Sequence, residues 1–424
     1  MTDQASDSGL AAREAALAAV DAALGRRAGL DEGLAGLSGL PPRDRAFSRM
    51  LAMTVLRRLG QLDLALNARM ARPPPEPVMA LLRLGLAQAL FMDTPDHAAV
   101  ATTLALAEKR KETLAFKGLI NGVLRGLLRE PPRLETDQLA PDWLLARWRA
   151  AYGEVDAAAI AAAIAEEPPT DLTLANPDQA EALAAALEGE VLPGGSVRTR
   201  RGGDIAEWPG YAEGGWWVQD AAAAIPARLL EIRPGESALD LCAAPGGKTL
   251  QLAAAGASVV AVDRSAARLR RLAANLERTR QSAEVVTADA AAWADTRSFD
   301  AVLLDAPCSA TGTFRRQPDV LWQARPADIA RLTALQSRLL DAAAQRVRPG
   351  GRLVYSVCSL EPEEGEAQVR AFLKRHADFV AVPVRPGEAG APAASLSQAG
   401  ALRILPHHMA GGLDGFFIAR FARR

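Results

Sequence analysis

The stretch Ser237–Lys248, with the sequence SALDLCAAPGGK, constrains the fold of this chain more than any other. Its apolar residues Ala238, Leu239 and Leu241 predict a short buried strand, and the small residues after them predict a tight turn into a helix. Glycines in such a turn let a ligand approach the backbone closely, and the helix start offers unpaired N–H groups to an anionic group. The stretch therefore predicts a Rossmann-like strand, turn and helix.

Several interpretations of this turn compete. A phosphate-binding P-loop would need glycine where Cys242 stands, and the dinucleotide fingerprint Gly-x-Gly-x-x-Gly is absent. S-adenosylmethionine fits better, because its carboxylate can accept hydrogen bonds from the turn and its ribose hydroxyls can bind an acid that ends the next strand. Asp263, at the end of the predicted strand 258–263, supplies that acid. A turn with a purely structural purpose stays an alternative.

The length and charge of the chain indicate several domains and one basic region. A chain of 424 residues exceeds one ordinary hydrophobic core, so two or three domains are expected. Basic and acidic residues nearly cancel overall, at 49 and 50, but residues 40–133 carry 15 Lys and Arg against 8 Asp and Glu. A basic helical module suggests a polyanionic partner, although a solvated helix face would explain the charge as well.

Apolar periodicity separates a helical part from an α/β part. Apolar residues at three- and four-residue spacing predict a helical bundle over residues 10–130. The predicted helices are 11–23, 42–59, 62–70, 77–92, 97–110 and 116–128. After Val218, strands near Ala238, Ser258, Ala283, Phe299 and Gly351 alternate with helices, which predicts a doubly wound α/β domain. Between the two, a short strand is expected at 172–175, and residues 402–405 and 415–421 predict a closing β-hairpin.

The chain shows no sign of secretion or of membrane insertion. Residues 1–9 are polar, and the longest apolar run, 80–92, is interrupted by Arg83. We therefore expect a cytoplasmic protein that binds no membrane. The three cysteines, Cys242, Cys308 and Cys358, give neither a disulfide framework nor zinc spacing, so no metal is expected.

Acids and thiols mark the ends of the predicted strands. Ligands of doubly wound sheets bind beyond the carboxyl ends of the strands. Those ends are Cys242 onward, Asp263, Asp289, Asp305 and Cys358. A single carboxylate there is easily a helix N-cap, but a whole set in one crevice predicts a functional site.

Two of these strand ends suggest a reaction. Asp305-Ala-Pro-Cys308 and Ser356-Val-Cys358-Ser would place two thiols and an acid beside a methyl donor. The C5 atom of cytosine becomes nucleophilic only after a group adds to C6, and a thiolate suits that addition. Asp305 suits hydrogen bonding or protonation at N3, and a base must then remove the C5 proton. These residues alone do not rank the two thiols, and either cysteine could instead be a small buried apolar residue.

These motifs resemble a known family. Asp240-Leu-Cys-Ala-Ala-Pro-Gly-Gly-Lys248-Thr, Asp305-Ala-Pro-Cys308-Ser and Ser356-Val-Cys358-Ser with Glu361-Pro-Glu-Glu364 closely resemble the RNA 5-methylcytosine methyltransferases of the Sun (Nol/Nop/Sun) family. The resemblance extends to Gln219-Asp220, Arg268, Asn275, the run from Gly312 to Trp322, and Asp414-Gly-Phe-Phe417.

The N-terminal part is similar to the NusB-type RNA-binding fold. The matching residues are Arg43-Asp-Arg-Ala46, Leu56-Arg57, Pro95-x-His97-Ala98 and Asn121-Gly-Val-Leu-Arg125. Together the two resemblances imply an all-α NusB-like domain over residues 1–135 and a linking α+β subdomain that contacts RNA over 136–216. An α/β Rossmann-like methyltransferase domain is then expected over 217–424.

The resemblance implies a role for each matching residue. Cys358 would be the C6 nucleophile, Cys308 would assist release of the product, and Lys248 would reach the reacting base. The implied S-adenosylmethionine site comprises Cys242, Ala243, Ala244, Pro245, Gly246, Gly247, Lys248, Asp263 at the ribose, Arg268, Asp289 near the adenine, and Asp305. The implied substrate is RNA, specifically small-subunit ribosomal RNA, bound by a monomer.

Two positions depart from the family pattern, and two other functions compete. Ala310 stands where the family usually has Gly, and Thr173 where it has Arg, which bears on local RNA contacts. A non-catalytic RNA-binding ribosome assembly factor on a methyltransferase scaffold is one alternative, against which both thiols and the strand-end acids argue. A NAD-dependent oxidoreductase is disfavoured by the missing glycine fingerprint.

Overall fold

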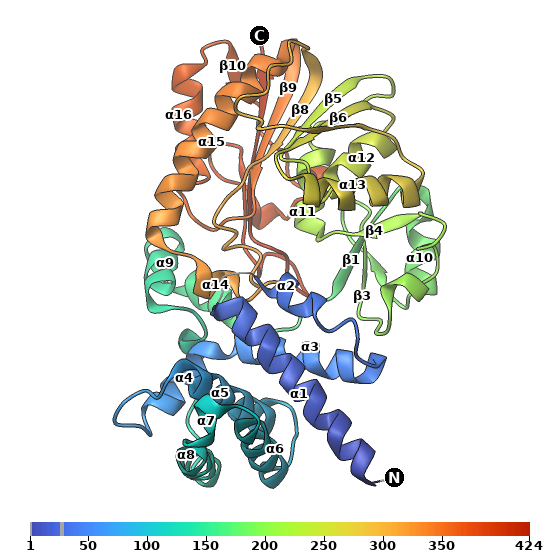
Figure 1. The fold of residues 1–424 in the computed structure, drawn as a ribbon. Helices are drawn as coiled ribbons and strands as arrows, with labels where there is room; N and C mark the ends of the chain where they lie inside the picture. Colours follow the sequence, from blue (N-terminus) through green and yellow to red (C-terminus); the bar gives the residue numbers. More distant parts are fainter. Residues whose placement is uncertain (1, 26–28) are drawn as a thin grey trace. The chain divides into compact units, whose positions relative to one another are not determined.

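The computed structural model of the chain, shown in Figure 1, describes residues 2–25 and 29–424 and contains two compact units. The first, here the helical unit, comprises Met1–Glu166 together with Phe314–Gln323. The second, here the sheet unit, comprises Glu167–Thr313 and Ala324–Arg424. The domain boundaries expected from the sequence stay predictions.

The helical unit confirms the predicted bundle. Its helices are α1 (Thr2–Leu24), α2 (Leu30–Ala35), α3 (Pro42–Arg57), α4 (Leu59–Asn67), α5 (Glu76–Phe91), α6 (Asp96–Glu108), α7 (Lys111–Leu114), α8 (Lys117–Arg129) and α9 (Asp142–Ile164), with the 3-10 turn η1 (Thr136–Leu139). Prolines at the starts of α3, α5, α6 and α9 place these boundaries, since proline fits the first turn of a helix but not its interior. The short helices α2 and α7 were not predicted.

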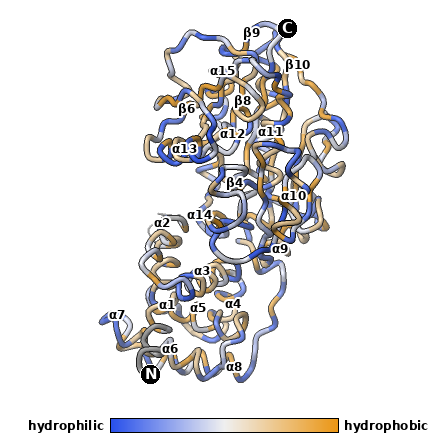
Figure 2. Tube along the Cα trace, turned by 90° about the vertical axis from the view of Figure 1, so that its right-hand side faces the viewer, coloured by the Kyte–Doolittle hydropathy of each residue, from blue (hydrophilic) through white to orange (hydrophobic). Residues whose placement is uncertain are grey.

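Helix α5 lies at the centre of this bundle. Residues 78–88 of α5 are all buried, and leucines such as Leu81 and Leu84 are completely inaccessible. Helix α8 instead buries one stripe, which includes Ile120, Leu124 and Leu127. Helix α5 is apolar on all sides, whereas α8 is apolar on one side only, and this difference explains their different burial. Figure 2 shows the hydropathy of each residue along the chain.

A segment distant in sequence completes the helical unit. Residues 314–323, which end in α14 (Val320–Gln323), pack among its helices. Phe314 is fully buried, with its ring 6.1 Å from that of Trp148. The Leu30 amide donates to Asp319 Oδ2 at 3.0 Å. The chain thus leaves the sheet unit after Thr313 and re-enters it at Ala324.

The sheet unit is built on one large sheet with the strand order β10-β12-β9-β8-β5-β6-β7. Its strands are β5 (Ser237–Leu241), β6 (Ser258–Asp263), β7 (Glu284–Thr287), β8 (Phe299–Asp305), β9 (Val347–Val357), β10 (Phe379–Ala381) and β12 (Phe416–Arg423). The run from β9 to β7 is parallel, while β12 is antiparallel to β9, β10 and β11 (Leu402–Ile404). The five predicted strands and the predicted C-terminal hairpin are therefore confirmed.

Helices cover both faces of this sheet, as expected for a doubly wound domain (Figure 1). Leu239, Leu241 and Leu304 pack with residues of α15 (Pro326–Arg346) and α16 (Glu366–Arg375). Ala238 and Leu303 alternate to the other face and pack with α11 (Ala221–Arg228) and α12 (Gly247–Ala254). Helix α13 (Ala266–Thr279) covers β6 on that second face.

A second, smaller sheet precedes the large one. It contains β1 (Thr170–Leu174), β2 (Glu190–Val191), β3 (Val197–Thr199) and β4 (Trp216–Val218) in the order β2-β3-β1-β4, with α10 (Ala180–Ala186) beside it. Its 3-10 turns are η2 (Pro177–Gln179) and η3 (Ile205–Glu207), and the C-terminal part of the unit has η4 (Glu388–Gly390) and η5 (Ala393–Ser395). The sequence predicted only β1 of these strands.

Within the described ranges, no helix is both long and apolar enough to cross a membrane.

Candidate active site

Neighbouring strands β8 and β9 bring the two cysteine motifs together. In their parallel pairing Asp305 lies opposite Ser356, and the Ala306 amide donates to the Ser356 carbonyl at 2.9 Å. Cys308 follows the end of β8 and Cys358 follows the end of β9, so the register alone places both thiols at one edge of the sheet. Their sulfur atoms are 3.4 Å apart.

A partly buried ion pair lies at the same edge. Lys248, at the start of α12, donates from Nζ to Asp305 Oδ2 at 2.8 Å, and Ser356 donates to the other carboxylate oxygen at 2.7 Å. Burial lowers the pKa of Lys248, but the charge and hydrogen bond of Asp305 outweigh burial and raise it overall. The charge of Cys358 also raises this pKa, so the ammonium lies within electrostatic reach of that sulfur. Lys248 therefore stays charged.

Two of the three thiols have a raised pKa. The hydrogen bond to Cys358 and burial raise the pKa of Cys308 well above the ordinary value, so Cys308 stays protonated near neutral pH. Cys242 has its pKa raised to about 12 by burial. Since a thiolate is the nucleophilic form, these raised pKa values disfavour attack by Cys242 and by Cys308 in this state.

The glycine turn between β5 and α12 is held by the acid that ends β6. Asp263 Oδ2 accepts from the Ala244 amide at 3.2 Å, and the Arg268 side chain donates to the Ala244 carbonyl. The peptide bond between Ala244 and Pro245 is cis. Gly246 has φ 109°, and a Cβ there would come within 2.8 Å of Leu272. The sequence needs glycine at this position both for its backbone angle and for its packing against α13.

A crevice of about 490 Å³ opens on this turn. Its lining includes the predicted residues Ala243, Ala244, Pro245, Gly246, Gly247, Lys248 and Asp305. The predicted residues Cys242, Asp263, Arg268, Asp289, Cys308 and Cys358 are not part of the lining. The turn and the Lys248–Asp305 pair therefore share one cavity.

The strand-end acids are placed differently from one another. Asp263 is buried, and its Oδ1 accepts from the Ser265 amide at 2.8 Å. Asp289 is exposed after β7, and its Oδ1 accepts from the Ala291 amide at 3.0 Å. Strand pairing places these two strand ends side by side, since Asp263 lies opposite Thr287. Each carboxylate oxygen has a second lone pair left for a ligand hydroxyl.

The crevice also contains a buried acid with spare hydrogen-bonding capacity. Asp240 is completely inaccessible; its Oδ2 accepts from Thr249 at 2.6 Å, while its Oδ1 has no hydrogen-bond partner among the described residues. An unsatisfied buried carboxylate oxygen beside a cavity fits a ligand that carries a cationic or N–H donor group. S-adenosylmethionine, which has an ammonium and a sulfonium, therefore fits this crevice.

Asp240 makes stability depend on pH. Burial raises the pKa of Asp240 to about 7. An exposed aspartate has a pKa of about 3.9, so between about pH 4 and 7 the folded chain binds more protons than the unfolded chain, and the free energy of unfolding falls as pH rises. Asp240→Asn, which cannot ionise, should remove up to about 4 kcal/mol of this decline. Urea unfolding at pH 5, 6, 7 and 8 measures the slope, and an unchanged slope would contradict the expectation.

Several lining residues were missed by the sequence analysis. They come from η3, its following loop, β4 and α13: Asp204, Ile205, Ala206, Tyr211, Trp217, Val218 and Arg278. Arg278 lies over the Tyr211 ring, 4.2 Å from its centre. The small sheet that contributes this wall has short strands with weak alternation, so no sequence signal placed it beside the glycine turn.

The two departures from the family pattern have local structural consequences. Ala310, in the loop after Cys308, has φ 57°, a left-handed conformation that glycine adopts without strain and alanine does not. Thr173 is buried in β1, and no described residue hydrogen-bonds its hydroxyl. The first departure stores strain in a cysteine loop, and the second leaves an unsatisfied hydroxyl where a long cationic side chain was expected.

Comparisons with known proteins agree with this geometry. Residues 227–422 match the family described as "16S rRNA methyltransferase RsmB/F", and residues 10–129 match the NusB family. A protein of Erwinia tasmaniensis named "Ribosomal RNA small subunit methyltransferase B" is 39% identical over 412 residues, which cover 90% of this chain and 91% of the relative. The solved structure of a methyltransferase homologue from Pyrococcus horikoshii is 28% identical, with a TM-score of 0.57, and covers 71% of this chain and 98% of that one.

The fold and the crevice define an S-adenosylmethionine-dependent methyltransferase preceded by a NusB domain. The chain belongs to the RsmB/F family of methyltransferases. A solved structure titled "Crystal Structure of PH0851", 23% identical with a TM-score of 0.78 and covering 96% of this chain and 98% of that one, shares the fold. The predicted fold, cofactor and family resemblance are thereby confirmed.

Proposed function

We propose that this protein methylates C5 of a cytosine in small-subunit ribosomal RNA through a covalent adduct between Cys358 and C6 of the base. The observation that carries the proposal is the pair of sulfurs 3.4 Å apart beside the Lys248–Asp305 ion pair. A methyltransferase acting on a nucleophilic nitrogen or oxygen needs no thiol, whereas C5 of cytosine needs one. The names of the relatives support ribosomal RNA as the substrate.

Each residue of the site then has a role. The Cys358 thiolate attacks C6, so that a C–S bond forms and electron density passes to C5. S-adenosylmethionine supplies an electrophilic methyl group to that carbon. Lys248 bears N–H donors and Asp305 has accepting oxygens, so Lys248 stabilises charge on the ring while Asp305 accepts from the exocyclic amino group. This differs from the expectation that Asp305 itself donates at N3.

Release of the product requires a second group. A base must accept the C5 proton before the C–S bond breaks and Cys358 departs as a thiolate. Cys308, whose sulfur lies 3.4 Å from that of Cys358, assists this elimination as that base once Cys358 is bonded to C6 and no longer shares its hydrogen bond. Bisulfite sequencing of ribosomal RNA from a deletion strain tests the whole proposal. Loss of one protected cytosine in the small subunit is expected, and no change would contradict it.

The donor site gives a second test, at Asp263. In the proposal this buried carboxylate binds the ribose hydroxyls, so Asp263→Ala should weaken binding of S-adenosylmethionine by roughly 1.5–3 kcal/mol, on the order of ten- to a hundredfold. Calorimetric titration measures the change. RNA affinity is the control and should barely move. Unchanged donor affinity would contradict the assignment of Asp263 to the ribose.

The basic helical unit provides the third test. Arg43, Arg49 and Arg72 are exposed, and none forms an ion pair with a residue that the structure describes. If they contact phosphates, replacing all three with Gln should reduce the slope of log K against log salt by about 3. Fluorescence anisotropy with ribosomal RNA over a salt series measures this slope.

A matched control separates local contacts from net charge. Arg233, Arg264 and Arg370 are exposed arginines of the sheet unit, and their replacement with Gln removes the same charge. Equal slopes for the two triple variants would contradict a phosphate-binding role for the helical unit. Point substitution is preferable to deletion of residues 1–133, because deletion also removes Leu30, whose amide donates to the buried Asp319.

A further inference from the structure

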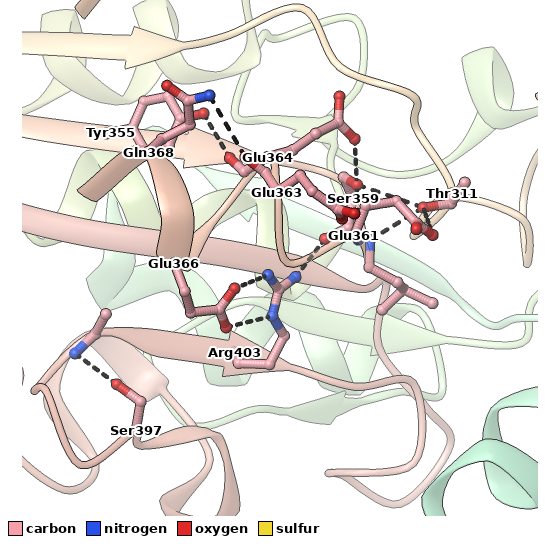
Figure 3. A network of polar contacts seen from close by, with 12 residues as sticks. Thr311, Tyr355, Ser359, Glu361, Glu363, Glu364, Glu366, Gln368, Ser397 and Arg403 are labelled. Carbon is pink, nitrogen blue, oxygen red and sulfur yellow. Dashed lines mark hydrogen bonds and ion pairs between the residues drawn. The ribbon is translucent and has the colours of Figure 1, made fainter. Parts of the chain in front are cut away.

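One buried carboxylate connects the two cysteine loops. Glu364 is completely inaccessible and lies in the turn before α16. Its Oε1 accepts from the Ser309 amide and from Gln336 Nε2, both at 2.9 Å. Its Oε2 accepts from the hydroxyls of Ser309 and Ser359, both at 2.5 Å. Figure 3 shows the contact between Glu364 and Ser359.

The two serines are the immediate neighbours of the two thiols. Ser309 follows Cys308 in the loop after β8, and Ser359 follows Cys358 in the loop after β9. The strands fix where these loops begin, and beyond the last ladder pair, Asp305 with Ser356, the loops stay in contact, since the Gly312 amide donates to the Cys358 carbonyl at 3.1 Å. The Ser309 and Ser359 hydroxyls are 3.0 Å apart, and both donate to the Glu364 carboxylate, which adds a shared acceptor beyond the sulfurs that lie 3.4 Å apart.

Glu364 is itself rigidly placed. The buried Tyr355 hydroxyl donates to its backbone carbonyl at 2.6 Å, and Gln336, which binds its side chain, also donates to the Pro307 carbonyl at 3.0 Å. Tyr355 lies in β9 and Gln336 in α15, so hydrogen bonds from one strand and one helix of the core hold Glu364 in place. Movement of either cysteine loop would therefore break charge-assisted hydrogen bonds.

No cation accounts for this buried charge. Among the described residues no Lys, Arg or His forms an ion pair with Glu364, and the five hydrogen bonds to its side chain come from four neutral donors. A buried carboxylate is costly unless it is fully hydrogen-bonded. A neutral apolar side chain would fill the same space at less cost, but it would remove the acceptor that Ser309 and Ser359 share and leave the two loops joined only by their direct contacts.

We propose that Glu364 is a positioning residue that sets the separation of Cys308 and Cys358 by hydrogen-bonding to the residue after each of them. The proposal rests on the proposed function, in which both thiols act on one base. Glu364 reaches the reaction only through these loops, because both of its oxygens are occupied by protein donors.

The separation of the thiols can be measured without any substrate. Diamide, an azo compound, takes two hydrogen atoms from a pair of nearby thiols, which become a disulfide while the azo compound becomes a hydrazine. We expect the Cys308–Cys358 disulfide to form readily in the full-length protein, as followed by mass spectrometry of the joined peptides. Glu364→Ala should slow its formation at least tenfold, and Glu363→Gln, which alters the exposed neighbouring glutamate, should not.

The conservative variant separates hydrogen bonding from charge. In Glu364→Gln the amide oxygen can still accept from the Ser309 amide and Gln336, and the amide nitrogen can donate to the two serine hydroxyls, which can reverse their direction. Glu364→Gln should therefore keep the disulfide rate and kcat within about threefold of the original protein. Glu364→Asp, one methylene shorter, should behave like Glu364→Ala.

The methylation rates of the Glu364 variants must rank in the same order as their disulfide rates. Glu364→Ala should lower kcat at least tenfold while leaving the affinity for S-adenosylmethionine unchanged, which also verifies folding. A native disulfide rate in Glu364→Ala would overturn the proposal. So would an inactive Glu364→Gln variant with a native disulfide rate, since Glu364 would then act as an acid or base. If Glu364→Ala fails to fold, Glu364→Gln and Glu364→Asp decide. Failure of the proposed cytosine chemistry would leave the disulfide result intact, so the two failures are distinguishable.

Discussion

Replacement of Cys358 by Ala should abolish both methyl transfer and every covalent adduct with RNA. Without the thiolate, nothing adds to C6, and C5 keeps the low reactivity of a neutral pyrimidine. A loss of roughly a thousandfold or more in kcat is expected, because removing a nucleophile removes the reaction path itself. Single-turnover methylation of ribosomal RNA measures the rate, and denaturing gels detect the adduct. Calorimetry with S-adenosylmethionine should show unchanged affinity.

Replacement of Cys308 by Ala should fail in the opposite way. Addition and methyl transfer can still take place, but elimination is impaired, so a protein–RNA complex that resists denaturation should accumulate when S-adenosylmethionine is present. The double variant should form no adduct, because trapping requires the nucleophile. If Cys358→Ala traps RNA and Cys308→Ala does not, the roles of the two thiols are reversed.

The contact between the two sulfurs does not rank them, because either atom can donate the hydrogen bond. The raised pKa of Cys308 comes first from that shared hydrogen bond and so describes the pair rather than one thiol. The residues alone did not rank the two cysteines, and the ranking in the sequence analysis came from the family resemblance. The two adduct experiments therefore decide which thiol attacks.

The sequence predicted the features that depend on local patterns. Helices α1, α3, α4, α5, α6 and α8 were found from apolar periodicity and their boundaries from Pro and Gly, and the strand ends that carry Asp263, Asp305 and Cys358 were found from short apolar runs. Because parallel strands end at one edge of a sheet, placing these ends correctly was sufficient to predict that their side chains gather.

Features that depend on distant contacts were not predicted. Nothing in the run 314–323 distinguishes a loop of the sheet unit from a segment packed against Trp148 and α2, because that choice depends on partners more than a hundred residues away. Glu364 belonged to a recognised motif, but a charged residue in a turn before a helix usually faces solvent, and only the packed structure shows it buried between two loops.

A buried ion pair in the small sheet gives the largest expected effect on stability. Arg198 in β3 binds Asp171 in β1 through two hydrogen bonds, of 2.7 and 2.8 Å, and both side chains are almost completely inaccessible. Arg198 also donates to the Ala410 and Gly412 carbonyls at 2.8 Å each. The Asp171 carboxylate accepts from the Ala221 amide at 3.0 Å, at the start of α11. This pair therefore connects the small sheet with a C-terminal loop and with α11.

Arg198→Met should lower the free energy of unfolding of the sheet unit by about 3–5 kcal/mol, since it leaves the Asp171 charge buried without its cation. Urea unfolding followed by tryptophan fluorescence measures the loss, because Trp208 and Trp216 lie in the core of the small sheet. Arg200→Met makes the same chemical change at an exposed position and should cost less than about 0.5 kcal/mol.

The double variant Asp171→Asn with Arg198→Met decides the cause of that loss. Asparagine removes the charge yet keeps an acceptor for the Ala221 amide, so the double variant should recover a substantial part of the stability lost in Arg198→Met. The stability that is not recovered measures the contribution of the hydrogen bonds from Arg198 to the Ala410 and Gly412 carbonyls. If Arg198→Met lowers the free energy of unfolding by less than about 1 kcal/mol, then water reaches the Asp171 carboxylate, and the ion pair is more solvated than its burial indicates. If the double variant is no more stable than Arg198→Met, the loss comes from the carbonyl contacts and packing rather than from an uncompensated charge.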